Sequence, residues 1–564
     1  MDFRTTLAGA LAQSAGLEIG EIKDWIEIPP NPDMGDYAFP CFRLAKAMHK
    51  APPVIAAELK ETVKLPEPFG RVESSGGYLN FFIDKAAYAR EIVGRVLREG
   101  ERYGASDEGA GKNVCLDYSS INIAKPFHIG HLSSTVIGHS LARIYGFMGF
   151  HTVSINHLGD WGTQFGKLIV AYKKWGDRDV VEKGSIRALL DLYVRFHEEA
   201  EKDPLLNDEG RAWFKRIEEN DSEATALFAW FKEITLRDVD SVYKLLDIEF
   251  DSYAGESFYQ DKMGPVIDIL REKNLLKQDD GAWLVDLSEF KMPPCLILRS
   301  DGATLYATRD LATAIYRKQT YDFYKSLYVV AYQQNLHFRQ FFKVLELMGY
   351  EWVRDCVHVN FGMVSMADGT MATRKGKVVF LEDVLNAAIE KTHEIMKEKS
   401  PDLENMEDVA RQVGVGAVVW GALYNSRIKD IVFSWEKALN FDGETGPYAQ
   451  YTHARCCSVM RKAGAYDPGV VNYGMLTDPA SVSLAKAIGA FPQSVKDAMD
   501  KNEPYLVSRS IIDVCSCFNK FYYENRIMDD SPVVRNARLA ITDAARSVIK
   551  TGLYLIGLHA PERM

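Results

Sequence analysis

The most constraining feature of the sequence is a change of hydrophobic period between residues 114 and 155. Val114 to Leu116 are a short apolar run of the kind that forms a buried strand. A polar loop follows, and from Val136 to Met148 apolar residues recur every three or four positions, which predicts an amphipathic helix that ends at Gly149. Thr152 to Ile155 predict the next strand. The order strand, loop, helix, strand predicts a right-handed parallel crossover, the unit of α/β folds.

Two histidines stand where the predicted helix begins. Ligands of such a unit bind at the carboxyl end of the strand, and His128 and His131 lie there, beside helix N–H groups that favour phosphate. Their spacing of three residues places both on one side of a first helical turn, and Gly130 between them lets a ligand approach closely. The pattern indicates phosphate recognition. Taken alone, it also fits a surface histidine pair beside a helix cap, or a metal site.

Composition limits the class of protein. A chain of 564 residues with 47% apolar residues predicts several globular domains. No segment reaches the roughly eighteen apolar residues of a membrane span, and the first residues lack signal-peptide features, so we expect a cytosolic protein without a membrane partner. The eight cysteines form no CxxC pair, which argues against zinc ribbons and disulfide frameworks. A net charge of −11 means that any RNA binding must rest on local basic patches.

Two runs of sequence carry a resemblance to a known family. They are SINIAKPFHIGH at residues 120–131 and NHLGDWGTQFG at residues 156–166, and together they resemble the signature of the arginyl-tRNA synthetases, which are class I aminoacyl-tRNA synthetases. The match extends over nearly the whole chain. It implies an α/β fold with three parts: a Rossmann-type parallel-sheet catalytic domain with an insertion, an N-terminal α+β domain that contacts the tRNA elbow and D-loop, and a C-terminal all-α anticodon-binding bundle.

The predicted domain boundaries follow from this match and from the local pattern. The N-terminal domain covers 1–108, the catalytic domain 112–390 with its insertion at about 168–295, and the helical domain 391–564. Apolar stripes predict the helices of the last domain. These helices span residues 408–425, 445–463, 480–499, 505–525 and 532–558.

The resemblance also implies which residues bind arginine. Asn156 and Gln334 correspond to residues that hold its α-amino end. Glu256, Tyr306 and Asp310 correspond to residues that hold the guanidinium group, because this planar cation needs anionic partners. Asn122 belongs to the same predicted site. From the sequence alone, Asp310 is equally well explained as the N-cap of the helix that follows it, and the Glu256 loop as a solvated acidic loop.

A further set of residues is implied for ATP. Gly362, Met363 and Val364 would offer backbone groups to adenine, and His128, Gly130 and His131 would contact the phosphates. The basic stretch 370–377 falls where class I synthetases carry the KMSKS loop, but its first lysine is absent. The resemblance implies that Lys125 supplies the missing charge. Arg374 and Lys375 are its predicted partners in the loop, with Lys375 also an ATP ligand, and Mg2+ is expected with ATP.

Several positions depart from the family pattern or are open to a plainer interpretation. The departures are Ile121, Ser133, Ala331 and Ala372. For tRNA, the resemblance favours Asn80 and Phe82 in the first domain and Tyr451 and Arg455 in the last. Helical aromatic residues are more often buried than stacked on bases, and a basic cluster such as the one at residues 43–50 is usually a solvated helix face.

The function that the resemblance implies is an arginine–tRNA ligase. It would convert L-arginine and ATP to arginyl-adenylate and transfer the arginyl group to the 2′-OH of the terminal adenosine of tRNA(Arg), as a cytoplasmic monomer without a metal site of its own. Two alternatives stay open at this stage. One is a related ligase for another amino acid, which would not need both Glu256 and Asp310; the other is a catalytically silent RNA-binding protein derived from a synthetase.

Overall fold

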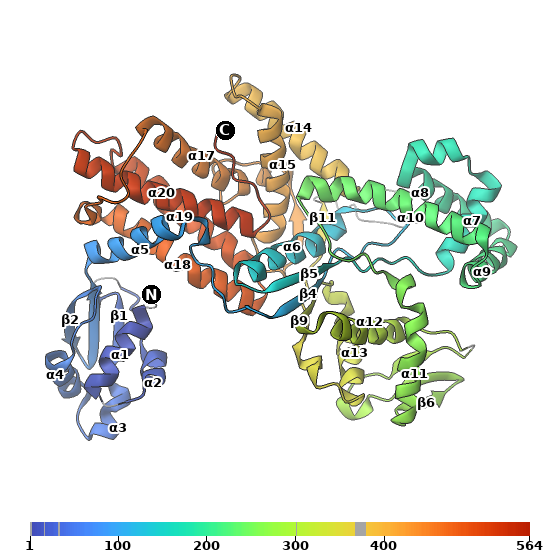
Figure 1. Cartoon of the computed structure of the whole chain (residues 1–564), viewed down its shortest axis with the longest axis horizontal. Coiled ribbons are helices and arrows are strands. Elements are labelled where there is room, and N and C mark those ends of the chain that lie inside the picture. The colour runs from blue at the N-terminus through green and yellow to red at the C-terminus, as the bar shows by residue number, and fades with distance from the viewer. Residues whose placement is uncertain (1–2, 16, 32–33, 301, 367–378) are drawn as a thin grey trace. The chain divides into compact units, whose positions relative to one another are not determined.

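The computed structural model describes residues 3–15, 17–31, 34–300, 302–366 and 379–564. These residues divide into two compact units (Figure 1). One unit contains residues 1–103, 456–490 and 513–548, and the other contains residues 104–455, 491–512 and 549–564. Most of the predicted site residues belong to the second unit, which is built around a parallel sheet.

The parallel sheet has four strands in the order β10-β9-β4-β5. They are β4 (Asn113–Asp117), β5 (His151–Ile155), β9 (Phe323–Tyr328) and β10 (Cys356–His358). Leu116 of the central strand pairs with Ser154 on one side and Leu327 on the other. Burial on both faces explains why β4 reads as an unbroken apolar run. The strands predicted at 114–116 and 152–155 are confirmed.

The crossover between β4 and β5 is α6 (Leu132–Phe147), as predicted. It ends because Gly149 adopts a φ of +87°, a left-handed conformation that side chains other than glycine rarely tolerate. Cys115, Val153 and Ile155 project from the sheet into a core that they share with α11 (Met263–Glu272), α12 (Tyr306–Tyr321) and α13 (Asn335–Leu347). Helix α6 covers the other face of the sheet (Figure 1).

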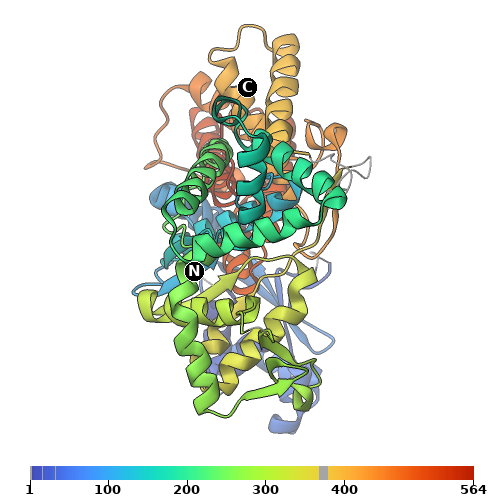
Figure 2. The ribbon, with the colours of Figure 1, turned by 90° about the vertical axis from the view of Figure 1, so that its right-hand side faces the viewer.

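The predicted insertion begins with four helices, α7 (Thr163–Trp175), α8 (Arg178–Lys202), α9 (Leu205–Glu218) and α10 (Ser222–Leu246). They pack on one another and form one group in both views (Figures 1 and 2). Helix α10 starts where the carboxylate of Asp221 accepts the N–H of Ala224, a side-chain N-cap. After α10 come η5 (Glu256–Lys262), α11 and an antiparallel sheet of β6 (Leu276–Asp279), β7 (Ala282–Val285) and β8 (Cys295–Leu298).

The second half of the parallel-sheet fold differs from expectation in two places. Helix α12 already begins at Tyr306, with Leu305 as its N-cap, so the interpretation of Asp310 as an N-cap is wrong. The alternating pattern of residues 358–364 predicts one strand, but only His358 lies in β10 and only Val364 lies in β11 (Val364–Met366), because the chain leaves the sheet after β10. Strand β11 pairs in parallel with β12 (Ile431–Phe433). Between β9 and β10 lie η7 (Tyr332–Gln334), α13 and η8 (Glu351–Asp355).

The rest of the chain is largely helical. Its helices are α14 (Leu381–Lys399), α15 (Met406–Leu423), α16 (Trp435–Ala438), α17 (Gly446–Ala463), α18 (Pro479–Lys501), α19 (Tyr505–Glu524) and α20 (Pro532–Leu555), with η10 (Tyr473–Leu476) before α18. The five helices predicted from apolar stripes are confirmed to within three residues at each end. None of the helices in the described part of the chain combines the length and the apolar character that a membrane crossing requires.

The N-terminal part of the first unit is α+β. Its antiparallel sheet has the order β1-β3-β2, formed by β1 (Tyr37–Pro40), β2 (Phe69–Ser75) and β3 (Tyr78–Ile83). The helices around it are α1 (Phe3–Ala15), α2 (Ile19–Trp25), η2 (Cys41–Leu44), α3 (Ala45–Met48), α4 (Pro52–Thr62), α5 (Lys85–Glu99) and η3 (Gly100–Arg102). Helix α5 begins at Asp84, whose carboxylate accepts the N–H of Ala87 at 2.7 Å.

Candidate active site

The loop that leaves β4 is held in a strained conformation. Ser119, Ser120 and Ala124 all have positive φ values, of 67°, 45° and 58°, which residues other than glycine rarely adopt. A buried ion pair lies where the loop leaves β4: the carboxylate of Asp117, the last residue of the strand, contacts the guanidinium of Arg317 at 2.8 Å. Burial acts to raise the pKa of Asp117, but the charge of Arg317, the neighbouring His157 and the hydrogen bonds from Ser120 and Arg317 together outweigh it and lower the pKa.

This ion pair is tied to the loop. The hydroxyl of Ser120 donates to Asp117 at 2.6 Å, so the charged pair and the strained backbone are one hydrogen-bonded structure. Farther along the loop, the side chain of Lys125 is exposed. Its ammonium group is close enough to His131 to lower the pKa of that imidazole. Lys125 therefore lies near His131, and its role in offsetting phosphate charge stays a prediction.

The two histidines cap each other. Nδ1 of His128 accepts the N–H of Gly130 at 3.0 Å, and Nδ1 of His131 accepts the N–H of His128 at 3.2 Å. The N–H of Ile129 is also occupied, by the carbonyl of Val379 at 3.1 Å, and the N–H of His131 by the carbonyl of His128 at 2.9 Å. At residues 128–131 the backbone N–H groups already have partners, so the histidine side chains are the donors that face outward there. Phosphate binding at this helix start stays a prediction.

The capping arrangement fixes what the rings can offer. Because Nδ1 of His128 accepts a backbone N–H, the proton of that neutral imidazole is on Nε2. Nδ1 of His131 lies 3.2 Å from the N–H and 3.3 Å from the carbonyl of His128, and the shorter contact favours the same tautomer. Burial, together with the neighbouring His128, lowers the pKa of His131 to about 3, and burial lowers the pKa of His128. Both rings are therefore uncharged near pH 7. Each presents one Nε2–H donor, and the positive charge beside them comes from Lys125.

The second signature run is hydrogen-bonded to the first. The N–H of Ile123 donates to Gly159 at 3.1 Å, and the N–H of Gly159 donates to Ile121 at 2.8 Å. A Cβ at Gly159 would lie 2.4 Å from Oδ1 of the exposed Asn122, so a larger residue there would displace this asparagine side chain. The two loops at the carboxyl ends of β4 and β5 therefore form one surface.

Asn156 lies fully buried at the end of β5. Its Nδ2 donates to the hydroxyl of Tyr243 at 2.8 Å, and its backbone N–H donates to Ser252 at 2.9 Å. Its Oδ1 is buried and has no hydrogen-bond partner among the described residues. A buried acceptor without a donor is costly, and a ligand ammonium group would satisfy it.

The predicted guanidinium ligand Glu256 starts η5 and already contacts a cation. Its carboxylate lies 3.0 Å from the guanidinium of Arg309, and both side chains are largely buried. Burial, with the nearby charges of Asp310 and Asp160, raises the pKa of Glu256 to about 7, although Arg309 acts in the opposite direction.

Buried Asp160 fixes the loop that carries Glu256. Its carboxylate accepts the N–H of Ser257 at 2.8 Å, the hydroxyl of the same serine at 2.7 Å and the ammonium of Lys232 at 2.6 Å. The aspartate of the GDWG sequence is thus a structural anion that joins three segments: its own loop, η5 and helix α10.

Asp310 has a partner as well. One of its carboxylate oxygens lies 2.5 Å from Nε2 of His337, one turn into α13. Burial acts to lower the pKa of His337, but the hydrogen bond and charge of Asp310 outweigh it and raise the pKa. Tyr306 is 70% exposed at the start of α12, and Gln334 is exposed at the end of η7.

The residues predicted for adenine are engaged with a neighbouring segment. The N–H of Gly362 donates to Arg427 at 2.7 Å, and a Cβ at Gly362 would lie 2.5 Å from the carbonyl of Lys429. The N–H of Met363 donates to Asp430 at 2.7 Å, and its carbonyl accepts the N–H of Ile431 at 2.8 Å. The adenine contact of residues 362–364 stays a prediction. Arg374, Lys375 and Ala372 lie outside the described residues.

The residues predicted for tRNA lie in different settings. Asn80 is buried, while Phe82 is half-buried beneath the guanidinium of Arg71, 3.9 Å from the ring centroid. On α17, Tyr451 is 40% exposed, and the guanidinium of Arg455 lies 4.9 Å from its ring centroid. This stacked pair stands on one helix face, because the residues are four apart. All four assignments stay predictions.

Sequence reasoning missed four residues that shape the site: Lys232, Tyr243, Arg309 and His337. Arg309 and His337 had a local signal, since each lies next to or within three residues of a predicted ligand. Lys232 and Tyr243 belong to the insertion and had no such signal. Their contacts to Asp160 and Asn156 span 72 and 87 residues of sequence.

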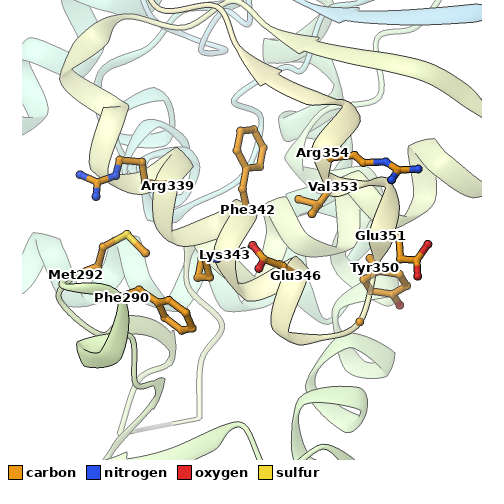
Figure 3. A pocket seen from close by; sticks show the side chains of 11 residues that line it. Phe290, Met292, Arg339, Phe342, Lys343, Glu346, Tyr350, Glu351, Val353 and Arg354 are labelled. Carbon is orange, nitrogen blue, oxygen red and sulfur yellow. Dashed lines mark hydrogen bonds and ion pairs between the residues drawn. The ribbon is translucent and has the colours of Figure 1, made fainter.

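A separate pocket lies on the other side of α13. It has a volume of about 860 Å³ and contains none of the predicted site residues (Figure 3). Lys343 of α13 lies beside Phe290, with its ammonium 4.6 Å from the ring centroid, and Met292, Phe342, Tyr350 and Arg354 also line the pocket.

The fold and the site together define a class I aminoacyl-tRNA synthetase. The sequence matches the class I tRNA synthetase (R) catalytic domain over residues 92–435, the DALR anticodon-binding domain over 449–564 and the arginyl-tRNA synthetase N-terminal domain over 1–83. The chain is 55% identical to the arginine–tRNA ligase of Clostridioides difficile and 52% identical to that of Alkaliphilus metalliredigens, each time over the whole of both chains. It belongs to the arginyl-tRNA synthetase family.

Solved structures agree on the fold. The arginyl-tRNA synthetase of Thermus thermophilus matches with a TM-score of 0.79 at 24% identity, covering all of both chains. The arginyl-tRNA synthetase of Plasmodium falciparum matches with a TM-score of 0.81 at 22% identity, covering 100% of this chain and 99% of the other.

Proposed function

We propose that the protein is an arginine–tRNA ligase, which forms arginyl-adenylate from L-arginine and ATP and transfers the arginyl group to the 2′-OH of the terminal adenosine of tRNA(Arg). The observation that carries the choice of amino acid is the pair of carboxylates at Glu256 and Asp310. Each carboxylate already contacts a side chain of the protein: Glu256 contacts the guanidinium of Arg309, and Asp310 contacts the imidazole of His337. A site for a neutral side chain would have no need of two partly buried carboxylates.

In the first step, a carboxylate oxygen of arginine attacks the α-phosphorus of ATP and the bond to pyrophosphate breaks. The protein's task is to position the reactants and to offset the charge on the phosphates. The Nε2–H groups of His128 and His131 donate to phosphate oxygens, and Lys125 supplies positive charge. Arg374 and Lys375 act with Lys125 on the leaving pyrophosphate, and Gly362, Met363 and Val364 contact adenine.

Arginine is held at both ends. The unpartnered Oδ1 of Asn156 accepts a hydrogen bond from the α-ammonium of arginine. Gln334 and Asn122 bind the same end of the substrate. Tyr306 and the two carboxylates receive the guanidinium. Mg2+ would arrive on the triphosphate, whose oxygens are its preferred ligands. Among the described residues there is no group of three or more His, Cys, Asp or Glu side chains that could hold a metal ion.

The tRNA contacts are proposed for both ends of the chain. Asn80 and Phe82 would contact the elbow, and the exposed Tyr451 with Arg455 would contact the anticodon arm by stacking and charge. We further propose that the protein acts as a monomer, as the family resemblance implies, and in the cytoplasm, where charged tRNA is consumed by ribosomes.

The test is pyrophosphate exchange into ATP with arginine, with and without total tRNA, and with lysine and citrulline in place of arginine. Exchange with arginine and tRNA together, and with neither control amino acid, is the expected result. Citrulline is the sharp control, because it keeps the shape of arginine and lacks the charge. Exchange with another amino acid would overturn the assignment of the substrate. A folded protein that binds tRNA but gives no exchange would instead support the silent RNA-binding alternative.

A further inference from the structure

A continuous chain of buried hydrogen bonds connects Asn156 with the backbone of His131. Nδ2 of Asn156 lies 2.8 Å from the hydroxyl of Tyr243, which lies 2.7 Å from the hydroxyl of Ser119. The hydroxyl of Ser119 lies 2.9 Å from that of Thr135, which donates to the carbonyl of His131 at 2.8 Å. None of the four side chains is more than 3% exposed, so bulk water does not compete for these bonds.

The number of protons available decides which group donates in each of these hydrogen bonds. Each hydroxyl has one proton to donate. That of Thr135 goes to the carbonyl of His131, so Thr135 can only accept from Ser119, and Ser119 in turn can only accept from Tyr243. Tyr243 has then used its proton and must accept from Asn156. Burial raises the pKa of the Tyr243 phenol, which keeps this proton in place at working pH.

This order decides which way the amide of Asn156 points. An asparagine amide can be turned over to exchange its oxygen and nitrogen, and only its hydrogen bonds select one orientation. Here the nitrogen must face Tyr243, so Oδ1 faces away and stays without a partner among the described residues. An ammonium group can donate to an oxygen but not to an NH2 group, so only this orientation suits the α-ammonium of an amino acid.

We infer that Tyr243 is a positioning residue of the amino-acid site, which holds Oδ1 of Asn156 toward the α-ammonium of the substrate. This inference rests on the proposed function of Asn156. Tyr243 belongs to α10 of the predicted insertion and not to the strands and loops of the parallel-sheet fold. Its ring packs against Phe127 and Phe250, with centroids 5.6 and 5.0 Å away, which locates the hydroxyl independently of its hydrogen bonds.

The test compares two ligands of the full-length protein: L-arginine and 5-guanidinopentanoate, which is arginine without its α-amino group. Calorimetric titration gives the affinity of each, with and without tRNA, for the parent, Tyr243→Phe and Asn156→Ala. The phenylalanine keeps the ring packing and removes only the hydroxyl. We expect the preference of Tyr243→Phe for arginine over the deamino ligand to fall about tenfold, the size of one hydrogen bond to a charged group. Its affinity for the deamino ligand should stay unchanged.

Tyr145→Phe is the matched control. Tyr145 is also fully buried on α6, and its hydroxyl bonds to Met499 and Asn502, away from the predicted site. This variant should lose stability comparably and keep the parent's preference. A Tyr243→Phe protein that keeps the preference while Asn156→Ala loses it would overturn the inference alone. If Asn156→Ala also keeps the preference, the proposed role of Asn156 fails, and the inference with it.

Discussion

The carboxylate of Asp310 and Nε2 of His337 lie 2.5 Å apart, so a residue predicted to hold the substrate's guanidinium already has an internal partner. Because the hydrogen bond and charge of Asp310 raise the pKa of His337, the imidazole is largely cationic at mildly acid pH. Protonated His337 and arginine then compete for one carboxylate, and raising the pH should favour arginine.

Replacing His337 by glutamine tests this competition. His337→Gln keeps a hydrogen-bond donor for Asp310 and removes the titratable charge. We expect it to bind arginine severalfold more tightly than the parent at pH 6, with the difference gone at pH 9, where the parent histidine is neutral too. Arginine affinities measured by calorimetry at both pH values provide the check. Weaker binding at pH 6 would mean that His337 supports the site instead of competing for it.

Glu256 should give arginine binding a second pH dependence. Its pKa is raised to about 7, so the ionised form that attracts a guanidinium is mostly present above pH 7 and is lost as the pH falls through this value. Affinity in proportion to the ionised fraction would be about tenfold lower at pH 6 than at pH 8. Glu256→Gln should bind weakly at both pH values. The His337→Gln background separates this effect from that of the histidine, and a flat profile there would contradict the role of Glu256.

Lys232 should matter for arginine and not for ATP. Its ammonium lies 2.6 Å from Asp160, which is fully buried, and Lys232→Met would leave that carboxylate without its counter-ion. Breaking such a pair typically costs about 3 kcal/mol of stability. The Glu256 loop, which Asp160 holds through Ser257, should loosen as well. We expect the KM for arginine to rise about tenfold, with the KM for ATP unchanged and Lys232→Arg close to the parent. Steady-state exchange kinetics and thermal unfolding measure the two effects, and equal increases in both KM values would argue against a local role.

His131→Ala should slow adenylate formation by orders of magnitude while arginine affinity stays nearly intact. The variant removes an Nε2–H donor to phosphate and also uncaps the N–H of His128. Because the pKa of His131 in the parent protein is about 3, this residue does not titrate between pH 6 and 9. Its ionisation should therefore cause no change of rate in that part of the pH–rate profile. Single-turnover adenylate formation and arginine titration measure the two quantities. Activity equal to that of the parent would exclude His131 from the reaction.

Lys125→Met tests the predicted source of positive charge. The side chain is exposed, so the variant should fold normally, and the methionine keeps the unbranched stem. We expect adenylate formation to fall about a hundredfold, with partial recovery in Lys125→Arg. The arginine affinity is the internal control, because Lys125 is proposed to act on phosphate. If adenylate formation changes little in Lys125→Met, the loop at residues 370–377 and not Lys125 is the source of the positive charge.

The sequence predicts those features that depend on residues close together in the chain. The unit of β4, α6 and β5 was predictable because strand burial, helix period and the stop at Gly149 are local properties. The clustering of Lys125 with the two histidines followed from the same unit. The interpretation of Asp310 as an N-cap was wrong because α12 starts four residues earlier, with no glycine or proline to mark the start.

The partners of the site residues could not be predicted in the same way. A histidine ring that caps its neighbour's N–H is a matter of side-chain rotamer, which hydrophobic period does not record. The contact of Tyr243 with Ser119 spans 124 residues and depends on where α10 packs against the loop after β4. The family resemblance predicts Glu256 and Asp310 as guanidinium ligands, but their contacts with Arg309 and His337 emerge only from the packed structure.

The loop at Ser119, Ser120 and Ala124 has a consequence for protein engineering. Non-glycine residues in this backbone region each cost on the order of 1 kcal/mol, and the ion pair of Asp117 with Arg317 holds the loop against that cost. Selection for heat tolerance should therefore find gains in this loop, for instance from Ala124→Gly, which removes no side-chain hydrogen bond. Such gains would relax the backbone that presents Lys125, so the most thermostable variants should be among the slowest catalysts.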